Sequence, residues 1–331
     1  MANRLANLLF LLTAGALVSS VAAQGVEVRP FDTTEQNPFA QIYGLPSIGP
    51  ATVLDAGKSE WRMSADLANY YAFDSRNAEQ ITVDGETRRY VLALRRGAGD
   101  GMEWGFELPY VRQSGGGLDQ FIEHWHEWGG FPNGGRELAP RNRLLIEYRR
   151  NGAPLVRLQD PGEGPGDVKL IAARRLASDA PDLALRAALK LPTGDSAGLR
   201  GSGAADAALW LSAACGSTQC RGAFAWYAGA GLLYAGRGDI LPQQQRRLIP
   251  FGGFGVMWRV TEDFAFKAEI DGHDAFYRDS ELRELNAAMQ GLFGGSWRIS
   301  RNHSVDFTIG EDVKVSSTPD VQFHLAWRAT Y

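Results

Sequence analysis

Val321-Gln322-Phe323-His324-Leu325-Ala326-Trp327-Arg328-Ala329-Thr330-Tyr331 is the stretch that decides the fold. Large apolar side chains alternate with polar ones along it, and Ala326 is the only break in the pattern. Side chains of a strand point to opposite faces in turn, so this period indicates a strand with one apolar and one polar face. A terminal aromatic on the apolar face is similar to the C-terminal signal of bacterial outer-membrane barrels. We therefore expect the barrel-assembly machinery to bind this strand.

The same alternation recurs elsewhere in the chain. The residues 102–110 place Trp104 and Phe106 on one face and Glu103 and Glu107 on the other. One alternating strand also fits a soluble sheet. Charges of both signs on the inner faces of several strands do not fit a soluble core, because burying an unpaired charge is costly. A polar lumen removes that cost, so the pattern predicts a barrel that faces lipid outside and its own lumen inside.

The whole chain predicts an all-β fold: a closed antiparallel transmembrane β-barrel of about 12 strands. Connections expected to be short alternate with longer ones, as in barrels with short periplasmic turns and long external loops. The barrel should occupy residues 60–331, with a long external loop over 113–165. The expected strands cover residues 60–73, 87–96, 101–112, 166–176, 182–192, 204–214, 221–235, 248–260, 264–277, 287–299, 303–313 and 321–331.

The first 23 residues have the layout of a cleavable secretory signal, with an apolar run from Leu8 to Val18 before Ala22 and Ala23. Such a signal predicts export, and the barrel pattern then predicts the outer membrane of a Gram-negative cell, in contact with its lipid. Residues 24–59 are rich in Pro and Gly and lack alternation. They form either a periplasmic lead or a segment inserted into the lumen, and the sequence leaves both open.

The 113–165 loop contains a helical pattern and a hairpin pattern. Leu118, Phe121, Ile122, Trp125 and Trp128 have the spacing of one apolar helical stripe, which we expect to pack at the barrel mouth. Residues 143–149 and 155–158 flank Asn151-Gly152 and predict a hairpin outside the membrane.

Several segments resemble a known family. They are Trp104-Gly-Phe-Glu-Leu-Pro-Tyr110, Phe121-Ile-Glu-His-Trp-His126, Phe131-Pro-Asn-Gly-Gly-Arg136, Gly166-Asp-Val-Lys-Leu170 and Leu189-Lys-Leu-Pro-Thr-Gly-Asp195. Together they resemble an uncharacterised proteobacterial family of outer-membrane barrel-like proteins that is known only as a domain of unknown function. Two of these pieces, Gly166-Asp-Val168 and Lys190-Leu-Pro-Thr-Gly-Asp195, also resemble the outer-membrane family linked to operons for aromatic-compound degradation. The resemblance implies location and shape, and it supplies no catalytic residue.

No motif predicts an enzyme or a cofactor. His124 and His126 lie two positions apart, so on a helix their side chains point away from each other and would not share a metal ion. Asn302 and His303 lie in a short turn without a nucleophile elbow. The net charge of −4 and pI near 5.8 give no basic surface for nucleic acid. We expect no cofactor, no metal site and no catalytic residue, with a disulfide between Cys215 and Cys220 as the default in an oxidising compartment.

The inward charges are the best candidates for a functional surface. We expect them either to line a narrow polar path that selects a small solute or to pair and fill the lumen. These residues are Glu103, Glu107, Lys169, Arg186, Lys190, Lys267, Glu269, Asp271, His273, His324 and Arg328.

Three functions follow in order of preference. The first is a passive pore or uptake channel for a small polar or amphipathic solute, gated by the 113–165 loop. The second is a closed structural or interaction barrel whose external loops bind a partner. An enzyme that acts on lipid comes last, because no constellation of residues supports it.

Overall fold

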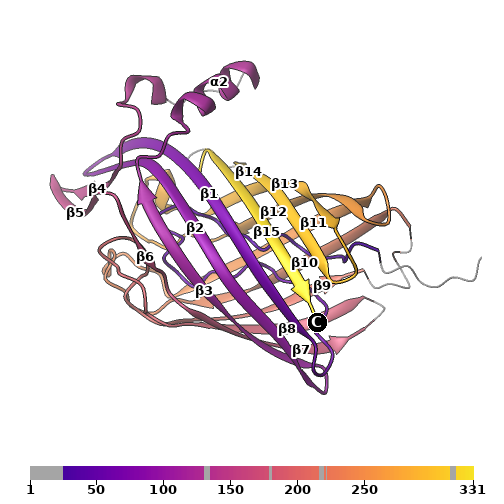
Figure 1. The fold of residues 1–331 in the computed structure, drawn as a ribbon. Coiled ribbons are helices and arrows are strands. Elements are labelled where there is room, and N and C mark those ends of the chain that lie inside the picture. The colour runs from indigo at the N-terminus through magenta and orange to yellow at the C-terminus, as the bar shows by residue number, and fades with distance from the viewer. Residues whose placement is uncertain (1–24, 130–134, 179–180, 216–219, 221, 314–317) are drawn as a thin grey trace, which may run out of the picture.

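The computed structural model of the protein describes residues 25–129, 135–178, 181–215, 220, 222–313 and 318–331. These residues form a barrel (Figure 1). Twelve strands follow one another around the wall, each antiparallel to its neighbours. They are β1 (Ser59–Arg76), β2 (Glu79–Gly99), β3 (Met102–Ser114), β7 (Lys169–Ala177), β8 (Asp182–Lys190), β9 (Asp206–Ala214), β10 (Phe224–Tyr234), β11 (Leu248–Arg259), β12 (Phe264–His273), β13 (Ala288–Arg298), β14 (His303–Asp312) and β15 (Val321–Thr330). The predicted secretory signal lies outside the described residues.

The first and last of these strands close the barrel. Strand β15 pairs antiparallel with β1 from Glu60 opposite Thr330 to Asn69 opposite Val321. Each of the twelve wall strands is therefore hydrogen-bonded on both sides, and no edge remains open within the wall. The predicted closed antiparallel barrel of about 12 strands is confirmed.

Large apolar side chains cover the outer face of the wall. Leu325 is 56% exposed and Phe293 is 59% exposed, although both lie in the middle of strands. Water would penalise so many exposed apolar groups, while hydrocarbon accommodates them. The wall thus has the surface of a transmembrane barrel of the outer-membrane type. Further exposed members include Trp104, Leu108, Leu170, Leu209, Leu211, Leu232, Phe254, Val256, Phe266, Ile270 and Phe307.

The two ends of the barrel differ in the length of their connections. Short turns join the strands at the end where the C-terminus lies. At the opposite end, above which α2 (Asp119–Gly129) projects, all connections except the β1–β2 turn are longer loops (Figure 1). Outer-membrane barrels place short turns in the periplasm and long loops outside the cell. We name the two ends periplasmic and extracellular accordingly. None of the helices in the described residues has both the length and the apolarity needed to cross a membrane.

The connection between the first two strands differs from the prediction. A long connection was expected over residues 74–86, but β1 and β2 extend to a turn of Asn77 and Ala78, where Asn77 has φ of 49°. The extension is stable because the hairpin of β4 (Leu145–Arg150) and β5 (Ala153–Leu158) pairs with it. A short strand β6 (Gly162–Pro165), which was not predicted, pairs with β3.

The predicted helix in the long loop is present as α2, followed by η1 (Arg136–Leu138). Its apolar stripe packs only in part, because Ile122 is fully buried while Phe121 is 51% exposed. Side chains of Trp125, His126 and Trp128 lie outside the described residues. The helix stands beyond the rim and does not enter the lumen (Figure 1). The loop therefore does not fill the barrel in this structure.

The lumen is instead occupied by residues 25–58, which we call the inner segment. Its indigo trace runs inside the barrel in Figure 1, and this decides between the two placements that the sequence left open. Val26 donates its backbone N–H to the carbonyl of Glu262 in the periplasmic β11–β12 turn. The segment rises from there, turns at Asn37–Tyr43, and descends again to enter β1 at Ser59. Both of its described ends lie at the periplasmic side.

Candidate functional site: the lumen and its inner segment

The turn of the inner segment is held in an apolar cluster at the extracellular mouth. The rings of Tyr43 and Phe276 stack with centroids 4.4 Å apart, and Tyr277 meets Phe39 edge to face at 6.3 Å. Phe276 and Tyr277 belong to the β12–β13 loop, which also contains η2 (Arg283–Leu285). Side chains from β2, β4, β9, β10 and β11 complete the cluster. The mouth is thus sealed by a core like that of a soluble protein.

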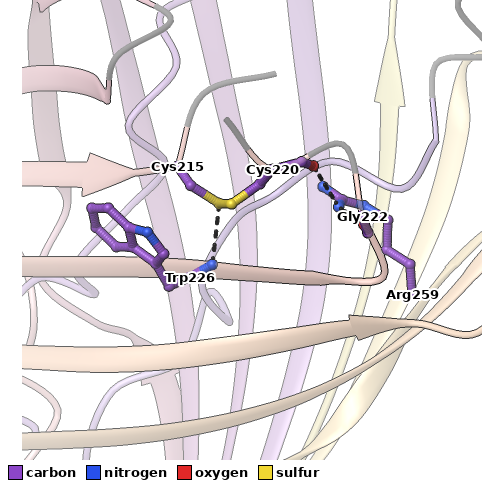
Figure 2. Close-up of a disulfide and its surroundings, with 5 residues drawn as sticks. All are labelled: Cys215, Cys220, Gly222, Trp226 and Arg259. Carbon is purple, nitrogen blue, oxygen red and sulfur yellow. Dashed lines mark hydrogen bonds between the residues drawn. A yellow bond between two sulfur atoms is a disulfide. The ribbon is translucent and has the colours of Figure 1, made fainter. Parts of the chain in front are cut away.

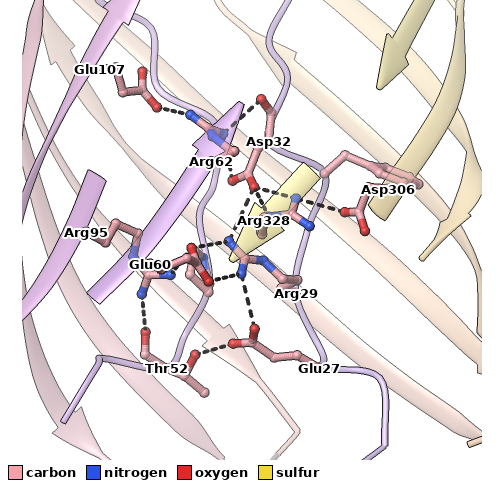
Figure 3. A network of polar contacts seen from close by, with 12 residues as sticks. Glu27, Arg29, Asp32, Thr52, Glu60, Arg62, Arg95, Glu107, Asp306 and Arg328 are labelled. Carbon is pink, nitrogen blue, oxygen red and sulfur yellow. Dashed lines mark hydrogen bonds and ion pairs between the residues drawn. The ribbon is translucent and has the colours of Figure 1, made fainter. Parts of the chain in front are cut away.

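Below this cluster the inner segment lies against a charged wall. Asp32 pairs with Arg62 of β1 at 3.1 Å and with Arg328 of β15 at 2.5 Å (Figure 3). Arg29 of the segment pairs with Glu60 at 2.8 Å. All of these side chains are at most 8% exposed. Burying such charges is tolerable only because each has an opposite charge in contact.

Two histidines of the wall are connected to the segment, His273 directly and His324 through Asp66. Glu35 of the segment hydrogen-bonds the ring of His273 at the extracellular end of β12. His324 of β15 contacts Asp66 at 2.8 Å, and Asp66 in turn accepts a hydrogen bond from Thr33 at 2.6 Å. These contacts tie the rising arm of the segment to β1, β12 and β15.

The descending arm is held mainly through its backbone. Lys190 donates to the carbonyl of Ile42 at 3.0 Å, Lys169 to that of Leu45 at 2.8 Å, and Arg186 to that of Pro50 at 2.7 Å. Trp210 Nε1 donates to the carbonyl of Ile48 at 2.9 Å. Carbonyl groups lacking a secondary-structure partner need such donors when buried. The cations of the wall therefore supply hydrogen bonds to carbonyl groups of the inner segment, which forms no sheet of its own.

All the inward charges predicted from the sequence lie on the inner side of the wall. Most are nearly inaccessible: Arg328 is 2% exposed, Lys267 3% and Glu103 3%. They pair with one another and with the inner segment, as in Arg186 with Glu103 at 3.1 Å and Lys267 with Asp306 at 3.0 Å. In this state the charges fill the lumen together with the segment.

A group of acids faces Tyr227 from β12. Glu269 accepts the backbone N–H of Phe31 at 3.0 Å, and Asp271 lies beside it on the same face. Gly253 and Gly255 make room for this group, since a Cβ on Gly255 would lie 2.2 Å from the ring of Tyr227. A Cβ on Gly253 would lie 2.1 Å from Asp271. The glycine-rich run of β11 thus allows close packing against these side chains.

The sequence reasoning missed the partners supplied by the inner segment and by β1. Arg29, Asp32 and Glu35 belong to a stretch without alternation, so no pattern assigned them a face. Glu60 and Arg62 do alternate with Trp61 and Met63, which was a usable signal for two further inward charges.

Cys215 and Cys220 are joined by a disulfide at the periplasmic end, between β9 and β10 (Figure 2). The Cys215 sulfur accepts the backbone N–H of Trp226 at 3.2 Å. Arg259 donates to the carbonyl groups of Cys220 and Gly222, both at 3.0 Å. The bond lies away from the lumen charges and closes one turn.

The other candidates for chemistry lie apart from the lumen. His124 is exposed on α2, and the side chain of His126 is outside the described residues. His303 stacks on Trp327 with centroids 5.5 Å apart. Within the described part of the chain, no three His, Cys, Asp or Glu side chains are grouped to hold a metal ion.

Small cavities remain between the inner segment and the wall. The largest of three is about 50 Å³ and lies among Arg29, Glu60, Arg95 and Arg186. The other two are about 20 Å³ each. Volumes of this size hold single waters or small water clusters and not an organic solute. None of these three cavities is therefore large enough for an organic solute.

Comparison with known proteins places the chain in a family. A family model described as "Protein of unknown function (DUF3187)" matches residues 7–331. The chain belongs to this family. No curated protein matches the sequence of this DUF3187 member.

Solved structures that are similar to this chain have low sequence identity to it. The COG4313 outer membrane channel from Pseudomonas putida F1 is similar with a TM-score of 0.55 and 11% identity, over 85% of this chain and 98% of that one. The toluene transporter TbuX of Ralstonia pickettii has a TM-score of 0.43 and 12% identity, over 93% and 97% of the two chains. The first likeness supports the outer-membrane barrel fold of the DUF3187 chain.

Proposed function

We propose that this DUF3187 protein is a passive outer-membrane channel for a small polar or amphipathic solute, and that the inner segment closes it in the state described. The observation that carries the proposal is the construction of the lumen. A charged wall surrounds a segment that is separate from the wall and continuous with it only at Ser59 among the described residues. A barrel that serves only as a support for its external loops does not need a separate segment in its lumen, because wall side chains can fill a lumen of this size.

The contacts of the segment are suited to reversible displacement. Lys169, Lys190 and Arg186 bind its carbonyl oxygens, and water or a polar solute can offer the same acceptors. Once the segment is displaced, these cations and the acids opposite them would line a hydrated path. The gate is then the inner segment, in place of the 113–165 loop proposed from sequence.

A disulfide lock tests this proposal. A Cβ built on Gly229 lies 2.8 Å from the Cβ of Ile48, so a shift of about 1 Å brings an Ile48→Cys and Gly229→Cys pair to disulfide geometry. Cys215 and Cys220 are replaced by serine so that only the new pair responds to reductant. In planar bilayers we expect openings in the reduced protein, loss of these openings on oxidation, and their return on reduction.

The Ile48→Cys single variant is the matched control and should conduct in both redox states. Asp32→Asn provides a second arm, because it removes the shared partner of Arg62 and Arg328 and should raise the open probability. Absence of conductance in both the reduced double variant and Asp32→Asn contradicts the channel.

The second candidate is a closed barrel whose external loops bind a partner. It is favoured by α2, which projects past the rim and exposes Phe121. A crosslinked partner that is lost when residues 119–129 are deleted, in a protein that never conducts, would support this function over the channel.

A further inference from the structure

Two cations on the inner wall, Lys169 and Arg89, have no carboxylate within salt-bridge distance among the described residues. Lys169 of β7 is 6% exposed and donates to the carbonyl of Leu45. Arg89 lies on the inner side of β2, in register with the buried Val91 and Ala93. Among the residues that the structure describes, neither forms a salt bridge within 4.0 Å. The acid opposite Arg89 on β1, Asp66, contacts His324 at 2.8 Å, so it does not pair with Arg89. Direct carboxylate contacts are therefore fewer than cations at this place.

The strand register adds to this imbalance. Lys169 of β7 stands directly opposite Lys190 of β8. Like charges in opposite positions destabilise a sheet unless an anion lies between them. Lys190 is compensated, since its ammonium contacts Asp167 at 2.6 Å and Asp206 at 2.9 Å. On the other side Lys169 stands opposite Glu107 of β3, but the carboxylate of Glu107 contacts Arg62 at 2.5 Å and lies beyond salt-bridge distance of Lys169. Two of the three N–H donors of Lys169 have no partner among the described residues.

These cations line one cavity beside the turn of the inner segment. The cavity is about 20 Å³, and its charged lining comprises Arg89, Lys169, Lys190, Arg200 and Asp167. Its apolar lining comprises Pro109, Val111, Leu199, Ile42 and Tyr43. In the described residues, Gln41 Oε1 and Arg200 Nε are buried at the same place without a hydrogen-bond partner. Buried polar atoms without partners are uncommon and call for a ligand or water.

We propose that this cavity binds the carboxylate of a small amphipathic anion. Lys169 and Arg89 hold the carboxylate, the guanidinium of Arg89 by parallel N–H donors. Pro109, Val111 and Leu199, which do not belong to the inner segment, cover the rest of the molecule. The inference rests on the proposed channel and names the class of its solute. The combination of cations and apolar side chains suits a carboxylate attached to an apolar group better than an inorganic phosphate.

Binding at this cavity is coupled to the inner segment. A cavity of about 20 Å³ admits one water, so an organic anion must displace the turn that carries Gln41, Ile42 and Tyr43. A ligand that binds only the displaced state shifts the population toward it. The anion thus opens the path that it will follow.

Calorimetric titration of the full-length protein in detergent tests the site. The probe is benzoate, and benzyl alcohol serves as the neutral probe of similar shape. We expect benzoate to bind and benzyl alcohol to bind at least about tenfold more weakly, because charged hydrogen bonds are the stronger ones. Replacing Arg89 and Lys169 together by glutamine should weaken benzoate binding by about tenfold or more.

Two further variants keep the test specific. Arg88→Gln is the matched control, since Arg88 is adjacent in β2 and pairs with Glu86; it should bind benzoate as the unaltered protein does. Lys169→Arg keeps the charge and should retain binding. Circular dichroism confirms that each variant is folded.

Three outcomes would overturn the site: no benzoate binding by the unaltered protein, equal binding by the Arg89 and Lys169 double variant, or equal loss in Arg88→Gln. Binding of inorganic phosphate without benzoate would overturn the carboxylate assignment. Bilayer conductance measured in parallel separates the two proposals. Conductance without benzoate binding would support the channel function and contradict the carboxylate site. Benzoate binding without conductance would support the carboxylate site and contradict the channel function.

Discussion

At the scale of single residues, the interior of this barrel is stabilised by charges that have partners far away in the chain. Arg62 and Arg328 share Asp32, although the three residues come from β1, β15 and the inner segment. Removing one partner of a buried ion pair typically costs about 3–5 kcal/mol, because the other charge stays buried and unpaired. Each such pair therefore fixes both the wall and the segment.

Glu284 is a buried acid at the extracellular mouth, outside the membrane-spanning strands. Its backbone carbonyl accepts a hydrogen bond from Asn37 at 3.2 Å, which connects it to the turn of the inner segment. Burial raises the pKa of Glu284 from 4.5 to about 7, and the negative charge of Asp74 adds to the rise. A raised pKa means that the protonated form favours the packed mouth below pH about 4.5, and that this stability is lost as the pH rises through about 7.

We therefore predict pH-dependent opening at the turn Asn37–Tyr43. Hydrogen exchange of its amides, corrected for intrinsic chemistry, should be faster at pH 8 than at pH 5 by about one to two powers of ten. Glu284→Gln should remove most of this dependence, while Glu281→Gln in the same loop, which is exposed, should retain it. The same pH dependence in Glu284→Gln as in the unaltered protein would falsify the assignment to Glu284.

At the scale of elements, strand alternation predicted the wall accurately because it reflects a local geometric property. The last strand was expected over 321–331 and is β15, Val321–Thr330. The prediction failed at β1 and β2, where the extension past the membrane depends on pairing with β4. Ile81 and Val83 alternate in that extension and are buried, so a weaker signal was present. Pairing between distant segments is not visible in a local period.

An arginine on the lipid face tests the membrane assignment of the wall. Leu325 lies outward in the middle of β15, so Leu325→Arg should lower the free energy of unfolding by about 2–4 kcal/mol in lipid vesicles. Ile299 is also exposed but lies at the periplasmic turn after β13, and Ile299→Arg should cost about 0–1 kcal/mol. Urea unfolding measures both. Equal costs at the two depths would be inconsistent with a bilayer around the wall.

At the scale of the whole molecule, the chain consists of a hydrogen-bonded wall and a segment threaded through it. The wall strands form a continuous ladder, whereas the inner segment contains no strand and is bound mainly by wall side chains. Parts of a protein with fewer cooperative backbone bonds open at lower free energy than the whole. We therefore expect the inner segment to leave the lumen at a lower free energy than the one needed to break the strand ladder of the wall.

Native-state hydrogen exchange should resolve this difference. Amides of the inner segment such as those of Phe31, Gly44 and Leu54, which donate to wall carboxylates, should exchange together in one sub-global opening. Amides in the middle of β11, β12 and β13 should exchange only at higher denaturant. A single common opening free energy for segment and wall would show that the segment is an inseparable part of the core.

The sequence by itself determined the membrane-spanning parts of the wall strands, the closed barrel and the inner side of the charges that alternate with apolar residues. These follow from a period of two that every strand carries in its own residues, together with the need to keep charges out of lipid. Only the tertiary structure decided that residues 25–58 lie in the lumen and that, among the described residues, Lys169 and Arg89 have no carboxylate within salt-bridge distance. Those outcomes depend on which distant groups meet, such as Asp32 with Arg62 and Arg328. No local sequence pattern predicts such long-range contacts, because they form only when the barrel closes around the inner segment.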